Sequence, residues 1–235
     1  GSEMCIRDRD SKGNWRTPFN PRSSNHRSDD YCEGTAWQWT WFVPHDVEGL
    51  VELMGGREAF IGKLDSLFVA DSSLEGELVS ADISGLIGQY AHGNEPSHHI
   101  IHFYNYVGQP WRTQELVDEV LQTLYFNNPN GLSGNEDCGQ MSAWYVLNAM
   151  GFYQVCPGRP LYSIGRPLFD KATVNLKDGK KFTVVATDNS CTNKYVQKML
   201  LNGEELVRPF FTHQDITDGG TLELIMGDKP VKTNN

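Results

Sequence analysis

The feature that most limits the fold is a change in hydrophobic pattern near residue 158 of this 235-residue chain. Before it, apolar residues recur at the three- and four-residue spacing of an α-helix. After it, apolar and β-branched residues alternate as they do in strands. We therefore expect a mainly α chain with a β-rich C-terminal part. The expected segments are a disordered or non-native leader over 1–14, a helical body over 15–158, and a β-rich extension over 159–235 that packs on this body.

Turn and helix signals refine this prediction. The pair Gly55-Gly56 divides a helical pattern, and Gly151 is placed to end another. Turns of the Asp-Gly or Asn-Gly type separate the later strands. The helices are predicted over residues 44–70, 97–107, 110–125 and 139–150, and the strands over residues 172–176, 182–187 and 221–226.

The composition excludes several classes of protein. A net charge of −10 argues against a nucleic-acid surface, because phosphate binding needs a basic face. No run of about 18 apolar residues is present, so we expect no membrane span. The five cysteines include no Cys-x-x-Cys pair, which argues against a zinc ribbon or a redox motif. The charged N-terminus does not resemble a signal peptide, and we expect the chain to begin inside a larger protein.

The first segment whose residues could take part in catalysis or binding is residues 31–41 (YCEGTAWQWTW). Here Glu33 precedes three tryptophans at alternate positions, two of which are Trp37 and Trp39. Apolar rings around a carboxyl raise its pKa, which suits a general acid. The alternative is a half-buried aromatic strand that carries an unrelated glutamate.

The second segment is residues 91–102 (AHGNEPSHHIIH). Asn94 and Glu95, in a tight loop before a proline, suit a hard cation such as Ca²⁺. His98 and His102 have the spacing of zinc ligands on one helix face, although the Glu of a His-Glu-x-x-His motif is absent. The alternative is a helix start with polar capping residues, which include His99.

The third segment is residues 131–144 (GLSGNEDCGQMSAW). Asn135, Glu136 and Asp137 follow Gly134, and glycines let a backbone approach a ligand closely. Acidic residues are also favoured before a helix for purely structural reasons, so helix capping is the alternative. Gln140 is a weaker polar candidate. Two carboxylates on separate loops are what glycoside hydrolysis requires, one to protonate the leaving oxygen and one to activate water.

These segments closely resemble glycoside hydrolase family 92, the calcium-dependent and mostly bacterial α-mannosidases. The resemblance rests on residues 31–41, 90–99 (YAHGNEPSHH), 131–144 and 152–167 (FYQVCPGRPLYSIGRP), and it covers nearly all of residues 15–230. It implies an N-terminal β-sandwich domain and an (α/α)6 barrel, of which this chain resembles only the last third. The implied fold is therefore a partial (α/α)6 toroid of the glycosidase type, with the β-sandwich domain missing.

The resemblance also implies roles for individual residues. Glu33 matches the general acid and Asp137 the general base of an inverting, exo-acting α-mannosidase. Glu95, with Asn94, matches the Ca²⁺ site. The residues implied to bind the mannose-containing oligosaccharide are Trp37, Trp39, His98, His99, Asn135 and Glu136.

Other functions stay open at this point. A calcium-dependent carbohydrate-binding module would use the aromatic residues without the Glu33 and Asp137 pair. A phosphorylase would need basic residues, and Arg159 and Arg166 are the clustered candidates. A truncated product without activity is the third alternative. The substrates implied are terminal α-mannosides, for example the α-1,2 linkages of N-glycan or mannan, and the implied location of the parent protein is periplasmic or secreted.

Overall fold

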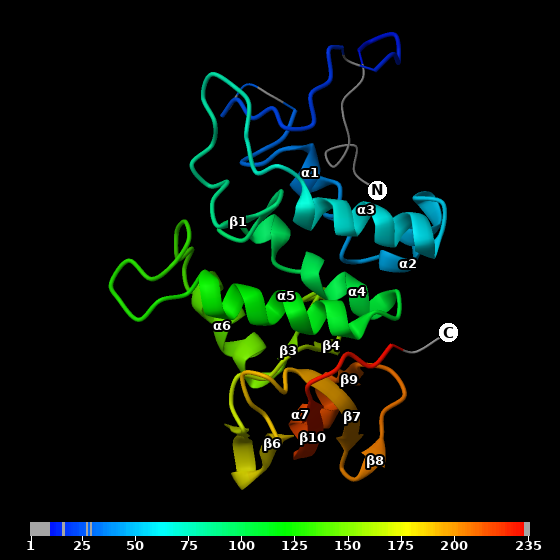
Figure 1. Ribbon diagram of the computed structural model, residues 1–235, viewed down its shortest axis with the longest axis vertical. Coiled ribbons are helices and arrows are strands. Elements are labelled where there is room, and N and C mark those ends of the chain that lie inside the picture. Colours follow the sequence, from blue (N-terminus) through cyan, green and yellow to red (C-terminus); the bar gives the residue numbers. More distant parts are fainter. Residues whose placement is uncertain (1–9, 16, 27, 29, 233–235) are drawn as a thin grey trace. The chain divides into compact units, whose positions relative to one another are not determined.

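The structure, a computed structural model, describes residues 10–15, 17–26, 28 and 30–232 (Figure 1). Most of the predicted leader, residues 1–9, lies outside the described residues. The chain divides into two compact units. Unit 1 comprises residues 1–98 and 124–141, and unit 2 comprises residues 99–123 and 142–235.

The complete α-helices in the described part of unit 1 are α1 (Ala36–Trp39), α2 (Val47–Leu53) and α3 (Arg57–Val69). The helix predicted over 44–70 is confirmed as α2 and α3, which are separated at Gly55-Gly56, where both glycines have positive φ. The aromatic strand considered for residues 31–41 is wrong. Thr35 and Gln38 form a capping box that starts α1 instead. The side chain of Thr35 accepts from the backbone of Gln38, and the side chain of Gln38 accepts from the backbone N–H of Thr35.

Outside these helices, the described part of unit 1 consists mainly of a short hairpin with strands of two residues each, turns and long loops. Strand β1 (Leu86–Ile87) pairs antiparallel with β2 (Tyr90–Ala91). Gln38 Nε2 donates to the backbone oxygen of Gln89 at 2.6 Å, which ties α1 to this hairpin. The fully buried aromatic and aliphatic side chains form the apolar core, and they are Trp41, Phe60, Leu64, Leu67 and Tyr90.

The helical part of unit 2 begins with the 3-10 turn η3 (Ile100–His102) and α4 (Phe103–Tyr106), followed by α5 (Pro110–Thr123). Helix α6 (Gln140–Met150) has its first two residues in unit 1. The helices predicted over 110–125 and 139–150 are confirmed, and Gly151 has φ 100 at the end of α6. The single helix predicted over 97–107 is wrong. It is divided into η3 and α4, with η2 (Glu95–Ser97) before it in unit 1, because almost every side chain in it is buried and polar side chains bond to fixed partners.

The β part of unit 2 forms two sheets. The larger has the strand order β5-β6-β10-β7-β8, with β6 and β10 parallel and the other neighbours antiparallel. The smaller has the order β3-β4-β9. The predicted strands are present as β5, β6 and β10, whereas the other strands and α7 (His213–Asp218) were not predicted. The strand bounds are β3 Phe152–Tyr153, β4 Leu161–Ile164, β5 Lys171–Asn175, β6 Lys181–Thr187, β7 Tyr195–Leu201, β8 Glu204–Glu205, β9 Phe210–Thr212 and β10 Gly220–Gly227.

One apolar core joins the two sheets of unit 2. Alternate residues of β6 and β10 are buried, which is the pattern of strands with one face on a core. Phe182 of the larger sheet stacks on Phe211 of the smaller, with ring centroids 5.6 Å apart. Among the residues that the structure describes, no helix is long and apolar enough to cross a membrane.

Candidate functional site

Three acidic side chains from distant parts of the sequence converge in unit 1. Glu95 is partly buried, and its pKa is raised first by that burial, then by a hydrogen bond and charge repulsion from the carboxyl of Asp137, and last by the charge of Glu33. The carboxyl of Asp137 is therefore close enough to interact with that of Glu95, and the charge of Glu33 acts on the same carboxyl.

The two outer acids occupy strained backbone positions. Glu33 and Asp137 both have φ 50, in the left-handed region that residues other than glycine rarely adopt. Cys138 and Gly139 continue this conformation with φ 56 and φ 100, so three successive residues turn the chain into α6. Strain of this kind is retained where the surrounding structure fixes a functional side chain. Both acids are exposed to solvent.

Asn94 joins the first motif to the second. Its Nδ2 donates to the backbone oxygen of Glu33 at 2.7 Å, and its Oδ1 accepts from the backbone N–H of Glu95 at 3.2 Å. A buried amide thus sets the position of both carboxyl-bearing residues.

Close backbone approach joins the second motif to the third. A Cβ on Gly134 would lie 2.6 Å from the backbone oxygen of Gly93, and a Cβ on Gly93 would lie 3.2 Å from that of Ser133. Only glycines allow this contact. Asn135 is exposed, and its Nδ2 lies 3.5 Å from a carboxylate oxygen of Asp82.

The tryptophans do not enclose Glu33 as the sequence suggested. The indole of Trp39 lies over Gly34 and donates from Nε1 to the backbone oxygen of Cys32 at 2.8 Å. The ring of Trp37 faces the ammonium group of Lys63, 4.7 Å from the ring centroid. The rings therefore support the loop beside Glu33 and leave its carboxyl open to solvent.

A chain of buried and partly buried hydrogen bonds lies near the acids, and no periodic pattern of residues indicates it in advance. His92 bonds through Nδ1 to the hydroxyl of Tyr90 at 2.8 Å and through Nε2 to the hydroxyl of Tyr125 at 2.7 Å. His98 bonds through Nε2 to the backbone oxygen of His92 at 2.9 Å and through Nδ1 to Nε2 of Gln140 at 3.2 Å. Burial lowers the pKa of His98 to about 4, so the ring is neutral near pH 7.

The zinc alternative loses its support. His98 bonds to His92 and Gln140 in unit 1, whereas His102 bonds to Ser163 and Asn148 in unit 2. Over residues 10–232, with the gaps stated above, no group of three His, Cys, Asp or Glu side chains is arranged to hold a metal ion. The oxygen donors around Glu95 nevertheless fit a hard cation by their chemistry, because carboxylate and amide oxygens are what Ca²⁺ prefers. A cation there would need further oxygen ligands from backbone, water or substrate.

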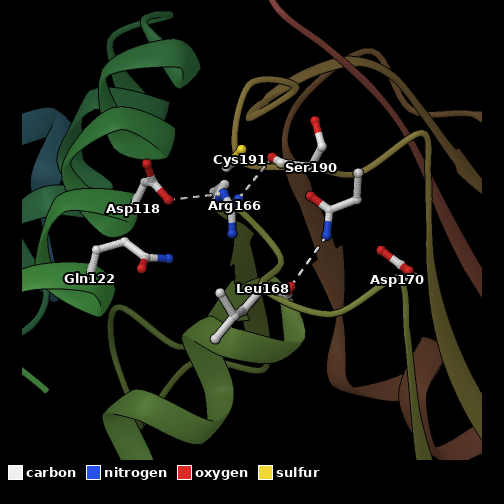
Figure 2. Close-up of a pocket in the computed structure, with 8 residues that line it drawn as sticks. Asp118, Gln122, Arg166, Leu168, Asp170, Ser190 and Cys191 are labelled. Atoms are coloured by element: carbon white, nitrogen blue, oxygen red, sulfur yellow. Dashed lines mark hydrogen bonds and ion pairs between the residues drawn. The ribbon is translucent and has the colours of Figure 1, made fainter. Parts of the chain in front are cut away.

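Unit 2 contains a separate pocket of about 450 Å³ (Figure 2). Arg166, only 3% exposed, lies against it with Nε 3.2 Å from Asp118 and Nη2 donating to the backbone oxygen of Ser190 at 3.1 Å. Lys194 also pairs with Asp118, at 3.5 Å. Because Asp118 compensates its charge and its Nη1 and Nη2 donate to the backbone oxygens of Pro167 and Ser190, Arg166 holds α5 to two loops. It does not provide the free anion site that the phosphorylase alternative needs.

Comparison with known proteins agrees with these motifs. The glycosyl hydrolase family 92 catalytic domain matches residues 2–228. A family GH92 α-mannosidase from Bacteroides thetaiotaomicron, solved in complex with mannoimidazole, is 42% identical with a TM-score of 0.89 and covers 96% of this chain. A family GH92 inverting mannosidase of the same organism is 46% identical with a TM-score of 0.80, over 94% of the chain.

The curated relative is an uncharacterized secreted glycosidase from Arthroderma benhamiae, 32% identical over 87% of this chain. The chain spans 25% of that relative and 30% of each of the two mannosidases. The resemblance found in the sequence is confirmed: this chain belongs to glycosyl hydrolase family 92.

Proposed function

We propose that the protein to which this chain contributes hydrolyses terminal α-mannosides with inversion at the anomeric carbon. The observation that carries the proposal is that the segments of Glu33, Glu95 and Asp137 meet, through the hydrogen bond from Asn94 to the backbone of Glu33 and the close approach of Gly93 and Gly134. The solved relatives, which are described as α-mannosidases and in one case as inverting, support it.

Glu33 is the proposed general acid, which protonates the glycosidic oxygen as the bond to the leaving group breaks. Asp137 is the proposed general base, which removes a proton from the water that attacks the opposite face of the sugar. Inverting pairs stand roughly 6.5–9.5 Å apart so that the water fits between them. The two carboxyls come from separate loops and both are open to solvent, which suits these roles.

Glu95 and Asn94 are the proposed Ca²⁺ ligands. The ion, when bound, supplies positive charge that orients sugar hydroxyls and acidifies nearby water. The repulsion that Asp137 and Glu33 exert on the carboxylate of Glu95 favours a cation at this place. Of the residues predicted to contact sugar, Asn135 is exposed, while Trp37, Trp39 and Glu136 are partly exposed. His98 and His99 are buried, and their sugar contacts stay predictions.

The larger context belongs to the proposal as well. We propose that residues 15–158 form part of an (α/α)6 barrel and residues 159–235 a β-rich extension. The rest of the barrel and an N-terminal β-sandwich domain would come from the parent protein. A periplasmic or secreted location is proposed from the description of the curated relative, and α-1,2-linked mannosides of N-glycan or mannan are proposed as substrates.

The acid role is tested with Glu33→Gln in the full-length parent. Loss of the proton donor should reduce the rate of mannobiose cleavage by about 10³-fold, because the departing sugar is a poor leaving group. The rate on a dinitrophenyl mannoside, whose leaving group needs no protonation, should change far less. Rates on both substrates are compared with those of the unmodified enzyme. Equal losses on the two substrates would contradict the acid role.

The metal role is tested with a chelator. Treatment with EGTA should abolish activity, and added Ca²⁺ should restore it, because the acids around Glu95 then lose and regain their counter-charge. Glu95→Gln should raise the Ca²⁺ concentration needed for half activity. Activity that chelation leaves unchanged would refute the calcium proposal.

A further inference from the structure

The turn that presents Asp137 is supported by two hydrogen-bond paths that are buried or partly buried. The first runs from His98 to Gln140, the first residue of α6. The second runs from His92 through Tyr125 to the backbone oxygen of Met141 at 3.1 Å. Both paths start in the segment that carries Glu95, so they connect it to the residues that follow Asp137.

The chemistry of the groups fixes the direction of each bond in the second path. The backbone oxygen of Met141 can only accept, so the hydroxyl of Tyr125 donates to it. That hydroxyl then accepts from Nε2–H of His92, whose Nδ1 accepts from the hydroxyl of Tyr90. The path therefore operates with one neutral tautomer of His92.

The protonated ring nitrogen of His98 follows from its partners in the same way. The backbone oxygen of His92 only accepts, so Nε2 of His98 carries the proton and donates. Nδ1 is then left as an acceptor for the amide N–H of Gln140. Both ring nitrogens are used inside unit 1, and the ring is 2% exposed.

Gln140 is joined directly to the strained turn. Its backbone N–H donates to the backbone oxygen of Asp137 at 3.2 Å, and the backbone N–H of Met141 donates to that of Glu136 at 3.3 Å. Left-handed φ values at Asp137 and Cys138 cost free energy and persist only where neighbours hold them. The side chain of Gln140, fixed by His98, provides such a hold.

We propose that His98 and Gln140 form a positioning pair that holds the Asp137 carboxylate in place for its reaction with water. The inference rests on the proposed function, and it gives His98 a different role from the sugar contact implied by the family resemblance. His98 acts through Gln140 on the turn and touches neither substrate nor reacting water.

The test uses the full-length parent enzyme and the variants His98→Gln, Gln140→Leu and their double. Each single variant should lower kcat by roughly 10- to 100-fold, because a shift of about 1 Å in a reacting group has that effect. KM should change by less than about threefold, since no sugar contact is lost. The double variant should lose no more than the worse single variant, because the two residues act as one unit.

A second readout separates positioning of the base from loss of the acid. A displaced base slows every substrate alike, so mannobiose and dinitrophenyl mannoside should lose the same factor, unlike the pattern expected for Glu33→Gln. His102→Gln is the matched control, because His102 is a buried histidine of unit 2 with two hydrogen-bonded ring nitrogens. It should lower stability without the shared kcat loss.

The outcomes are distinct. A parent that cleaves no α-mannoside overturns the proposed function and this inference with it. An active parent overturns the inference alone if His98→Gln raises KM and leaves kcat unchanged, or if the two single losses multiply in the double variant. Should His98→Gln fail to fold, Gln140→Leu decides the matter by itself, since Gln140 is partly exposed. Unchanged kinetics for Gln140→Leu would refute the pair.

Discussion

Units 1 and 2 have similar lengths of chain but differ in how their residues are held in place. Unit 2 places its apolar residues on alternating strand positions and buries them in one core between two sheets. Unit 1 has short helices, a two-residue hairpin and long loops, and it carries the acids together with strained φ values at Glu33, Asp137 and Cys138.

The difference shows where stability and chemistry are located. Regular strands stabilise through area buried, and side chains on them face either a core or solvent. Loops held by close glycine contacts and by a side-chain amide such as that of Asn94 can instead bring several carboxyls together. The strained backbone that this requires costs free energy. We therefore expect changes in unit 1 to act on activity, and changes in unit 2 to act on stability.

The largest expected effect tests unit 1. Asp137→Asn in the full-length parent should lower kcat by about 10³- to 10⁴-fold on mannobiose and on dinitrophenyl mannoside alike, because the base is lost. Asn accepts the left-handed conformation as well as Asp does, and the residue is exposed. The denaturation midpoint should therefore be unchanged, and a large loss of stability would break the contrast between the units.

The core of unit 2 supplies the next test. Phe182 is fully buried against Phe152 and Phe211, so Phe182→Ala should reduce the free energy of unfolding by about 3–5 kcal/mol. Phe169→Ala is the matched control, because Phe169 is 52% exposed and should change stability by less than about 1 kcal/mol. Guanidinium unfolding of the chain measures both, and equal effects would refute a core centred on Phe182.

Acid should weaken unit 2 through His102. Burial, opposed by the hydrogen bond that Nε2 donates to Oδ1 of Asn148, lowers the pKa of His102 from 6.5 to about 4. Between these values the unfolded chain binds a proton that the folded chain does not, so stability falls as the pH drops from 6.5 towards 4. The loss reaches about 3 kcal/mol at most. Urea unfolding at several pH values should show a shallower pH dependence for His102→Gln, and an identical slope would contradict this assignment.

The smallest expected effect concerns backbone strain at Cys138. Cys138→Gly should raise stability by up to about 1 kcal/mol, because glycine adopts φ 56 without steric cost. Cys156→Gly makes the same chemical change where φ is not left-handed and should lower stability instead. Thermal unfolding compares the two, and a loss of stability in Cys138→Gly would show that the turn is not strained.

Prediction from sequence worked where a single pattern dominates. Helices α3, α5 and α6 and strands β5, β6 and β10 follow from periodicity and from turn residues such as Gly55-Gly56. Strands β4, β7 and β9 were missed because cross-strand partners decide them more than local pattern does. The aromatic strand considered as an alternative for residues 31–41 is wrong, since the capping box of Thr35 and Gln38 outweighs the alternation of the tryptophans.

The family, the three motifs and the order of helices before strands could be read from the sequence alone, because each depends on a continuous stretch of residues. The meeting of the segments that carry Glu33, Glu95 and Asp137 became visible only in the folded molecule. Those relations depend on Asn94, Gly93 and Gly134, whose contacts join residues far apart in the chain. Spacing along a sequence cannot specify such distances, because loop conformation is set by partners that lie tens of residues away.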